Sequence, residues 1–179
     1  MSDERGRMKT NLQGRVAIVT GGSEGIDQAV ALRMAESGAD VAIATRSAEK
    51  AAPVVKRIQA MGRRAAHAPV DIASYPSCQE MVQRVIRDFG KVDIMVTNGS
   101  PRWKEALALP FHEIDPANYE AHIRMRLITR LYCIRAVLDH MREREYGKIV
   151  NITTDAGRHP TPSESLIGAA AAGLIMATK

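Results

Sequence analysis

Five short apolar runs, rich in β-branched residues, alternate along the chain with longer segments of mixed polarity. The runs cover residues 15–20, 40–45, 64–70, 92–97 and 148–153. Short continuous apolar runs are typical of strands that are buried on both faces of a sheet. The segments between them repeat apolar residues at helical spacing, near residues 25–37, 47–61, 76–89 and 116–143. The alternation predicts an α/β fold with a parallel sheet, because parallel strands need crossover connections.

The predicted architecture is doubly wound, with helices on both faces of the parallel sheet. Signals for helix starts add detail to it. Ser77 followed by Glu80 has the spacing of a capping box, and Asp115 before Pro116 supplies an N-cap with a proline at the first helical position. A chain of 179 residues is long enough for one domain with a substantial core. We therefore expect a flexible tail over residues 1–13 and a single domain over residues 14–179.

Composition narrows the classes of partner. The formal net charge of +5 favours an anionic ligand, but no compact run of Lys and Arg is interleaved with aromatic residues. A nucleotide cofactor is therefore favoured over nucleic acid. Cys78 and Cys133 lack metal-type spacing, so we predict reduced thiols and no metal site. The charged amino-terminal residues and the lack of an apolar run of about 18 residues predict a cytoplasmic protein without a membrane span.

A glycine cluster follows the first apolar run, where an open α/β sheet binds its ligand. Gly21, Gly22 and Gly25 stand between the first expected strand and the first expected helix. Glycines there let the backbone approach a pyrophosphate, whose charge is met by free N–H groups and the helix dipole. A plain strand-to-helix turn would also use glycine, but this position favours a dinucleotide site.

Four stretches in chain order carry a resemblance to a known family. They are VAIVTGGSEGI from residue 16, VDI from residue 70, VDIMVTNGS from residue 92 and GKIVNITTDAG from residue 147. Together they resemble the short-chain dehydrogenase/reductase family over about residues 14–179. The resemblance implies a Rossmann-like fold with strand order 3-2-1-4-5 and an NAD(P) cofactor. It also implies hydride transfer between nicotinamide and a carbonyl or alcohol substrate.

The resemblance implies a cofactor site, spread over the turns after the first, third and fourth strands. Its residues are Gly21, Ser23, Gly25 and Ile26 at the phosphates, Asp71 and Ile72 at the adenine, and Asn98 and Gly99 after the fourth strand. Asp27 stands where the family has its third glycine. It would add bulk and negative charge beside an anionic ligand, although an acid in a first helical turn is also favourable.

The end of the second expected strand bears on the choice between NAD and NADP. Thr45 and Arg46 stand there in place of an acid, and an arginine suits a 2′-phosphate. Glu24 acts against this choice, because NADP-using relatives often have a basic residue in that part of the glycine loop. The balance favours NADP slightly, with a solvated surface charge as the alternative for Arg46.

The catalytic positions depart from the family pattern. The resemblance implies a tyrosine as proton donor, a lysine that lowers its pKa, a serine that orients the substrate and a helix asparagine. The register places Ile167 at the tyrosine, Ala171 at the lysine, Thr154 at the serine and Arg126 at the asparagine. Thr154 keeps a hydroxyl, whereas isoleucine and alanine have no proton to donate.

Nearby groups leave two functions open. Glu164 and His159 precede Ile167 and are acids or bases of a suitable type, but the favoured explanations are a charge at the start of a helix for Glu164 and an exposed loop side chain for His159. Trp103 could wall a substrate pocket, or equally it could be a partly buried aromatic residue that covers the edge of the sheet. The first function is an NAD(P)-dependent oxidoreductase that uses Thr154 and Glu164. The second is a catalytically inactive or fragmentary Rossmann protein that binds nucleotide or a protein partner.

The family pattern continues beyond the last helix of this chain with further strands and a substrate-covering segment. We therefore expect a domain that is incomplete at its C-terminal end, with the fifth strand at an edge of the sheet and no lid over the pocket. In the family, helices equivalent to residues 116–143 and 164–179 form a dimer face, so the resemblance allows a homo-oligomer.

Overall fold

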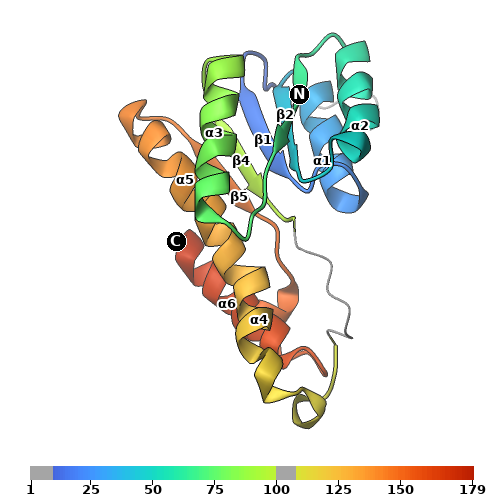
Figure 1. Ribbon diagram of the computed structural model, residues 1–179, viewed down its shortest axis with the longest axis vertical. Helices are drawn as coiled ribbons and strands as arrows, with labels where there is room; N and C mark the ends of the chain where they lie inside the picture. The colour runs from blue at the N-terminus through green and yellow to red at the C-terminus, as the bar shows by residue number, and fades with distance from the viewer. Residues whose placement is uncertain (1–9, 100–107) are drawn as a thin grey trace.

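A five-stranded parallel sheet forms the centre of the described part of the chain (Figure 1). The computed structural model describes residues 10–99 and 108–179. The strands are β1 (Val16–Thr20), β2 (Asp40–Thr45), β3 (Ala65–Pro69), β4 (Ile94–Thr97) and β5 (Lys148–Asn151). They lie in the order β3-β2-β1-β4-β5, and each neighbouring pair is parallel. The predicted α/β class and strand order are confirmed.

Helices cover both faces of the sheet and divide the core into two clusters. One face packs on α1 (Gly25–Glu36) and α2 (Ala48–Ala60), and the other packs on α3 (Tyr75–Phe89) and α5 (Thr129–Glu143). Neighbouring residues of β1 belong to opposite clusters, since Val19 packs with the α1 and α2 side chains and Ile18 with those of α3 and α5. Both residues are fully buried, as strands between two helical layers require.

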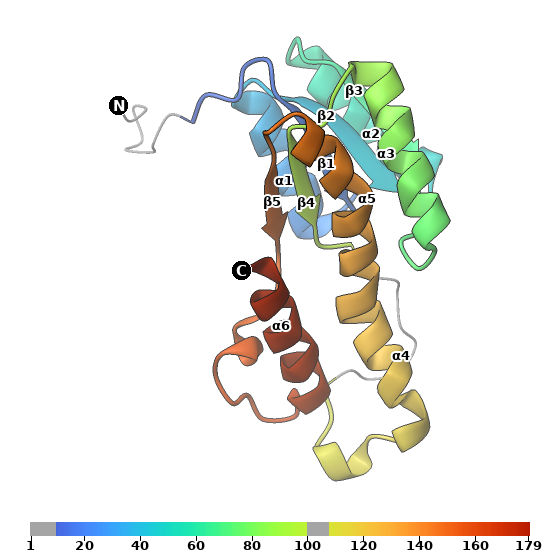
Figure 2. The same cartoon turned by 90° about the vertical axis from the view of Figure 1, so that its left-hand side faces the viewer.

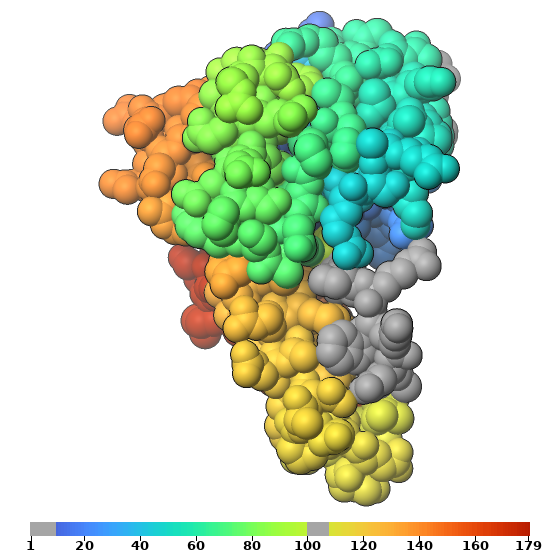
Figure 3. All heavy atoms as spheres, viewed as in Figure 1, coloured from blue at the N-terminus to red at the C-terminus, as the bar shows by residue number. Residues whose placement is uncertain are grey.

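The segment predicted as one helix over residues 116–143 is interrupted. It contains a 3-10 turn (Pro116–Asn118), α4 (Tyr119–Ile123), a π-helical turn (Arg124–Ile128) and then α5. The last helix, α6 (Ser165–Thr178), packs against α4 and the π turn (Figure 2). Figure 3 shows α4 and its neighbours extending beyond the body formed by the sheet and its helices. A π turn changes the direction of side chains along a helix and is frequent at functional sites.

Helix starts agree with the sequence only in part. Asp115 caps its turn as predicted, because its carboxylate accepts the Ala117 N–H at 2.9 Å. The capping box at Ser77 is wrong, since the N-cap of α3 is Ser74. Ser77 instead lies within the first turn, where its hydroxyl accepts the Asp71 N–H at 2.9 Å. At α6, Ser163 has a left-handed φ of 65° and the N-cap is Glu164.

The edges and ends of the described part show three further features. β5 lies at an edge of the sheet, and Val150 on it is 47% exposed. Near the start of the described residues, the Leu12 N–H donates to the Ser37 carbonyl, and the Leu12 side chain packs on the core. Within residues 10–99 and 108–179, no helix is both long and apolar enough to cross a membrane.

A buried carboxylate, Asp93, ties the start of β4 to β1 and to the end of α5. Asp93 is 0% exposed, and its Oδ2 accepts the Val16 N–H at 3.0 Å. Lys91 Nζ lies 3.0 Å from Oδ2, and Arg144 donates to Oδ1 at 3.1 Å. Burial alone would raise the pKa of Asp93, but the hydrogen bonds from Lys91, Val16 and Arg144 hold it below its usual range.

The environment of the His140 imidazole predicts that the stability of the protein depends on pH. Its Nε2 accepts the Val92 N–H at 3.1 Å, and burial, followed by the charge of Arg144, lowers the pKa of this imidazole. The folded protein therefore takes up this proton less readily than the unfolded chain, so stability falls as the pH drops below about 6.5. We expect the free energy of unfolding to fall by about 1 kcal/mol, the typical net contribution of one hydrogen bond.

Urea unfolding at pH 7.5 and at pH 5.5 measures this loss. His140→Gln does not titrate, so its unfolding free energy should change less between the two pH values. An equal fall in both proteins would contradict the assignment.

Candidate functional site

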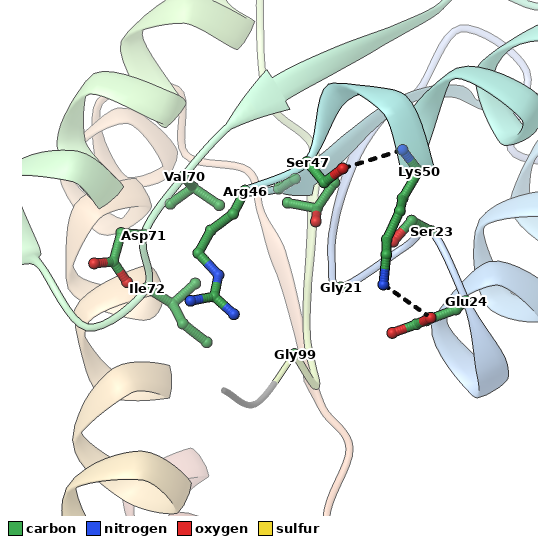
Figure 4. A pocket seen from close by; sticks show the side chains of 12 residues that line it. Gly21, Ser23, Glu24, Arg46, Ser47, Lys50, Val70, Asp71, Ile72 and Gly99 are labelled. Carbon is green, nitrogen blue, oxygen red and sulfur yellow. Dashed lines mark hydrogen bonds and ion pairs between the residues drawn. The ribbon is translucent and has the colours of Figure 1, made fainter. Parts of the chain in front are cut away.

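A cavity of about 490 Å³ lies beyond the carboxyl ends of β1, β2 and β3 (Figure 4). It is enclosed by the β1–α1 turn, the end of β2 with the start of α2, and the segments that follow β3 and β4. The lining residues are Gly21, Ser23, Glu24, Ala44, Thr45, Arg46, Ser47, Lys50, Val70, Asp71, Ile72 and Gly99. Open parallel sheets bind ligands at this edge.

The glycine turn has the geometry that the sequence predicts. Gly21 and Gly25 have φ values of 74° and 62°, which other residues rarely adopt. A Cβ on Gly21 would lie 2.9 Å from the Gly99 Cα and 2.6 Å from an Asp27 carboxylate oxygen, so only glycine fits there. Glu24 lines the cavity and directly precedes α1. The free N–H groups and dipole of α1 therefore begin beside the cavity and favour a phosphate.

Basic side chains stand at the β2 side of the cavity. Figure 4 shows the Arg46 guanidinium reaching over the cavity toward Ile72, while Lys50 extends toward Glu24. The Lys50 Nζ lies 3.6 Å from a Glu24 carboxylate oxygen, and the Lys50 N–H donates to the Ser47 hydroxyl at the start of α2. Glu24 is thus paired with a lysine, which weakens the expected objection to a 2′-phosphate.

The segment after β3 forms the opposite wall. The Asp71 carboxylate accepts the Ala73 N–H at 3.1 Å, and the Asp71 N–H donates to Ser77. These bonds hold the turn that presents Ile72 and Val70 to the cavity. An apolar side chain beside an exposed carboxylate can hold an adenine ring by contact and by a hydrogen bond.

Most of the residues expected at the cofactor meet in this cavity. Gly21, Ser23, Arg46, Asp71, Ile72 and Gly99 all line it. Gly25, Ile26 and Asn98 are not part of the lining. Gly25 and Asn98 are next to lining residues in the chain, whereas Ile26 is one residue further away and is 66% exposed. Trp103 lies outside the described residues. Sequence reasoning missed Lys50 and Val70, although the spacing of Ser47 and Lys50 at a helix start was a usable signal for the first.

Asp27, at the position of the third glycine, belongs to a buried polar network. It is 8% exposed, and its carboxylate accepts the Asn98 side-chain amide at 2.6 Å. Burial raises the pKa of Asp27, while the Asn98 hydrogen bond and the charge of Arg130 act against the rise. Arg130 is 7% exposed and donates to the Asn98 carbonyl at 2.8 Å. The added negative charge is therefore accompanied by a buried guanidinium.

The two candidate catalytic groups, Thr154 and Glu164, lie apart. The Thr154 hydroxyl accepts the Ala156 N–H at 3.3 Å and donates to Asp155 at 3.4 Å, and Thr154 lines a cavity of about 440 Å³ near the end of α6. Glu164 lines a different cavity with His159 at the start of α6. Neither lines the cavity at the glycine turn.

The positions assigned to tyrosine, lysine and asparagine lie on α6 and on the π turn. Ile167 and Ala171 are 7% and 4% exposed, so both are packed into the helix interface. Burial lowers the pKa of Arg126, and the charge of Glu164 partly restores it. The Arg126 Nε is buried and has no hydrogen-bond partner within the described part of the chain.

Comparison with known proteins agrees with this geometry. A family model described as short chain dehydrogenase matches residues 15–179. The (2S)-[(R)-hydroxy(phenyl)methyl]succinyl-CoA dehydrogenase subunit BbsD of Thauera aromatica is 35% identical over 171 residues, which cover 94% of this chain and 66% of that protein. The chain thus spans about two thirds of the length of this relative.

Two solved structures with bound cofactor have the same fold. NAD+-bound xylitol dehydrogenase superposes with a TM-score of 0.86 at 26% identity, over 93% of this chain and 63% of that one. A metagenomic short-chain oxidoreductase in complex with NADP superposes with a TM-score of 0.82 at 30% identity, over 93% and 74%. With a matching family model over nearly its whole length, the chain belongs to the short-chain dehydrogenase family.

Proposed function

We propose that this chain binds a nicotinamide dinucleotide, with NADP preferred to NAD, in the cavity at the carboxyl ends of β1, β2 and β3. The cavity is the observation that carries the proposal, because it joins a glycine turn, the start of α1 and two basic side chains. Gly21 and Ser23 would hold the pyrophosphate, and Asp71 with Ile72 the adenine. Arg46 and Lys50 would hold the 2′-phosphate.

The 2′-phosphate assignment predicts that Arg46→Ala loses affinity for NADPH and keeps its affinity for NADH. A hydrogen bond between charged groups contributes about 1.5 to 3 kcal/mol, which corresponds to a loss of about tenfold to a hundredfold. Titration calorimetry with both cofactors measures it. Arg57→Ala is the matched control, because Arg57 is an exposed arginine of α2, the helix that follows Arg46, and does not line the cavity.

Two results would contradict the proposal in different ways. An equal loss for NADPH and NADH would remove the role of Arg46 at the 2′-phosphate. Absence of binding by either cofactor at millimolar concentration would remove the proposed function as a whole.

A second candidate function is hydride transfer between the bound nicotinamide and a carbonyl or alcohol, supported by the dehydrogenase and oxidoreductase names of the relatives. The nicotinamide would supply the hydride, and Thr154 would orient the substrate oxygen. Nucleotide binding has the stronger support, because Thr154 and Glu164 line different cavities. Without the family tyrosine and lysine, proton transfer would fall to an unusual group such as Glu164.

Turnover separates the two functions. Oxidation of NADPH on a panel of carbonyl substrates, lost in Thr154→Ala or in Glu164→Gln, would support catalysis by these groups. The absence of turnover in a protein that binds NADPH is the result expected for a nucleotide-binding relative without the usual chemistry.

A further inference from the structure

Within the described part of the chain, the cavity at the glycine turn covers one half of the place where a dinucleotide would lie. In a doubly wound sheet the strand order reverses between β1 and β4, and a dinucleotide spans this point with one nucleotide on each side. Among the residues that the structure describes, all that line the cavity except Gly99 come from the β1, β2 and β3 side. The cavity thus has the extent of the adenosine half with its phosphates.

Beside Gly21 and Asn98, at the start of the β4 side, the described part of the chain holds buried side chains of its own. Asp27 replaces a residue without a side chain, and its carboxylate is buried against Gly21 and hydrogen-bonded to the Asn98 amide. Arg130 closes the same region from α5 through its bond to the Asn98 carbonyl. The side-chain NH2 group, the backbone carbonyl and the backbone N–H of Asn98 are therefore engaged within the protein.

Further along this side, the residues at the family's anchoring positions cannot hold a nicotinamide ribose. Ala171, at the position of the lysine, has no hydrogen-bonding side chain and is 4% exposed. Ile167, at the position of the tyrosine, is 7% exposed and equally apolar. Placing a second nucleotide here would require desolvation of its polar groups without compensating hydrogen bonds, which costs free energy.

We propose that the ligand of this site is the adenosine half alone, an adenine nucleotide that carries a 2′-phosphate and a 5′-diphosphate. The nicotinamide half of a bound dinucleotide then contributes almost nothing to affinity. This inference rests on the proposed function, because it places the adenosine in the same cavity. It differs in a measurable respect: a site that serves hydride transfer must contact the nicotinamide, whereas this site need not.

The test compares four ligands by titration calorimetry on the unaltered protein. They are NADP, NADPH, 2′-phospho-ADP-ribose, which lacks only the nicotinamide, and nicotinamide mononucleotide. We expect the first three to bind with dissociation constants within about threefold of one another, and the mononucleotide to give no binding at millimolar concentration. A dinucleotide that binds tenfold or more tightly than 2′-phospho-ADP-ribose would overturn the inference and leave the proposed function intact. Failure of all four to bind would overturn the proposed function.

Variants of Asp27 test whether this side chain is the reason that the site binds the adenosine half alone. Asp27→Gly restores the family residue and should increase the affinity for NADP relative to 2′-phospho-ADP-ribose. Asp27→Asn keeps the size of the side chain and removes its charge, so it should leave the ratio near that of the unaltered protein if bulk closes the region. An unchanged ratio in Asp27→Gly, with the fold intact by circular dichroism, would show that Asp27 does not close it.

Discussion

Asp93→Ala is expected to lower the free energy of unfolding by about 3 to 5 kcal/mol, the scale for breaking a buried, hydrogen-bonded ion pair from one side. The substitution removes the acceptor of the Val16 N–H and leaves Lys91 and Arg144 without their common partner. Because Asp93 is fully buried, water cannot replace these contacts without rearrangement of the strand ends. Such a loss is a large part of the stability of an ordinary domain.

Denaturant unfolding at pH 7 measures the change, with Asp93→Asn as the matched control. Asparagine keeps an acceptor for Val16 but loses the charge, so its loss should be smaller than that of alanine. The difference in unfolding free energy between the unaltered protein and Asp93→Ala should also become smaller at acidic pH. The lowered pKa of Asp93 contributes stability above about pH 4, and this contribution is lost as the pH falls through the folded-state pKa. Equal unfolding free energies for all three proteins at pH 7 would contradict this role.

The fold could be predicted from the sequence because its strands are continuous apolar runs separated by turn signals. Local interruptions could not, because they depend on tertiary contacts. The apolar repeat runs through residues 116–143 without a break, yet the structure has a π turn at residues 124–128, where the Thr129 hydroxyl bonds to the Met125 carbonyl. Ser77 has the spacing of a capping residue, but its hydroxyl accepts the Asp71 N–H in the turn after β3.

The lining of the cavity could be predicted where it depends on single residues that follow strands. It could not be predicted where it depends on pairs of side chains from different elements. Arg46 directly follows β2, and Asp71 follows β3 after one residue, so topology alone brings them to one cavity. The pairing of Glu24 with Lys50 joins two turns and changes the electrostatic reading of the glycine loop. The association of Asp27 with Arg130 joins α1 to α5, and no local pattern connects these two residues.

From this association we predict that Asp27 and Arg130 are energetically coupled in the stability of the fold. Arg130→Met should lower the free energy of unfolding by about 3 kcal/mol, because it leaves the Asn98 carbonyl without its donor and Asp27 without a nearby positive charge. In a background of Asp27→Gly the same substitution should cost less, since no buried carboxylate then needs a counter-charge. The expected coupling free energy is about 1 to 2 kcal/mol, within the range for contacting charged residues.

A double-mutant cycle by denaturant unfolding measures the coupling, and an Arg135→Met cycle with Asp27→Gly serves as the control. Arg135 is an exposed arginine of the same helix that bonds to Asp139, so its cycle should be additive. Additive losses in the Arg130 cycle would mean that the guanidinium stabilises only the carbonyls it contacts and that the charge of Asp27 is met in another way. A coupling of the expected size would identify the arginine as the compensation that lets an acid occupy the position of the family's third glycine. The substitutions at residues 27 and 130 would then be one linked change, by which the fold keeps its glycine turn while the β4 side of the site closes.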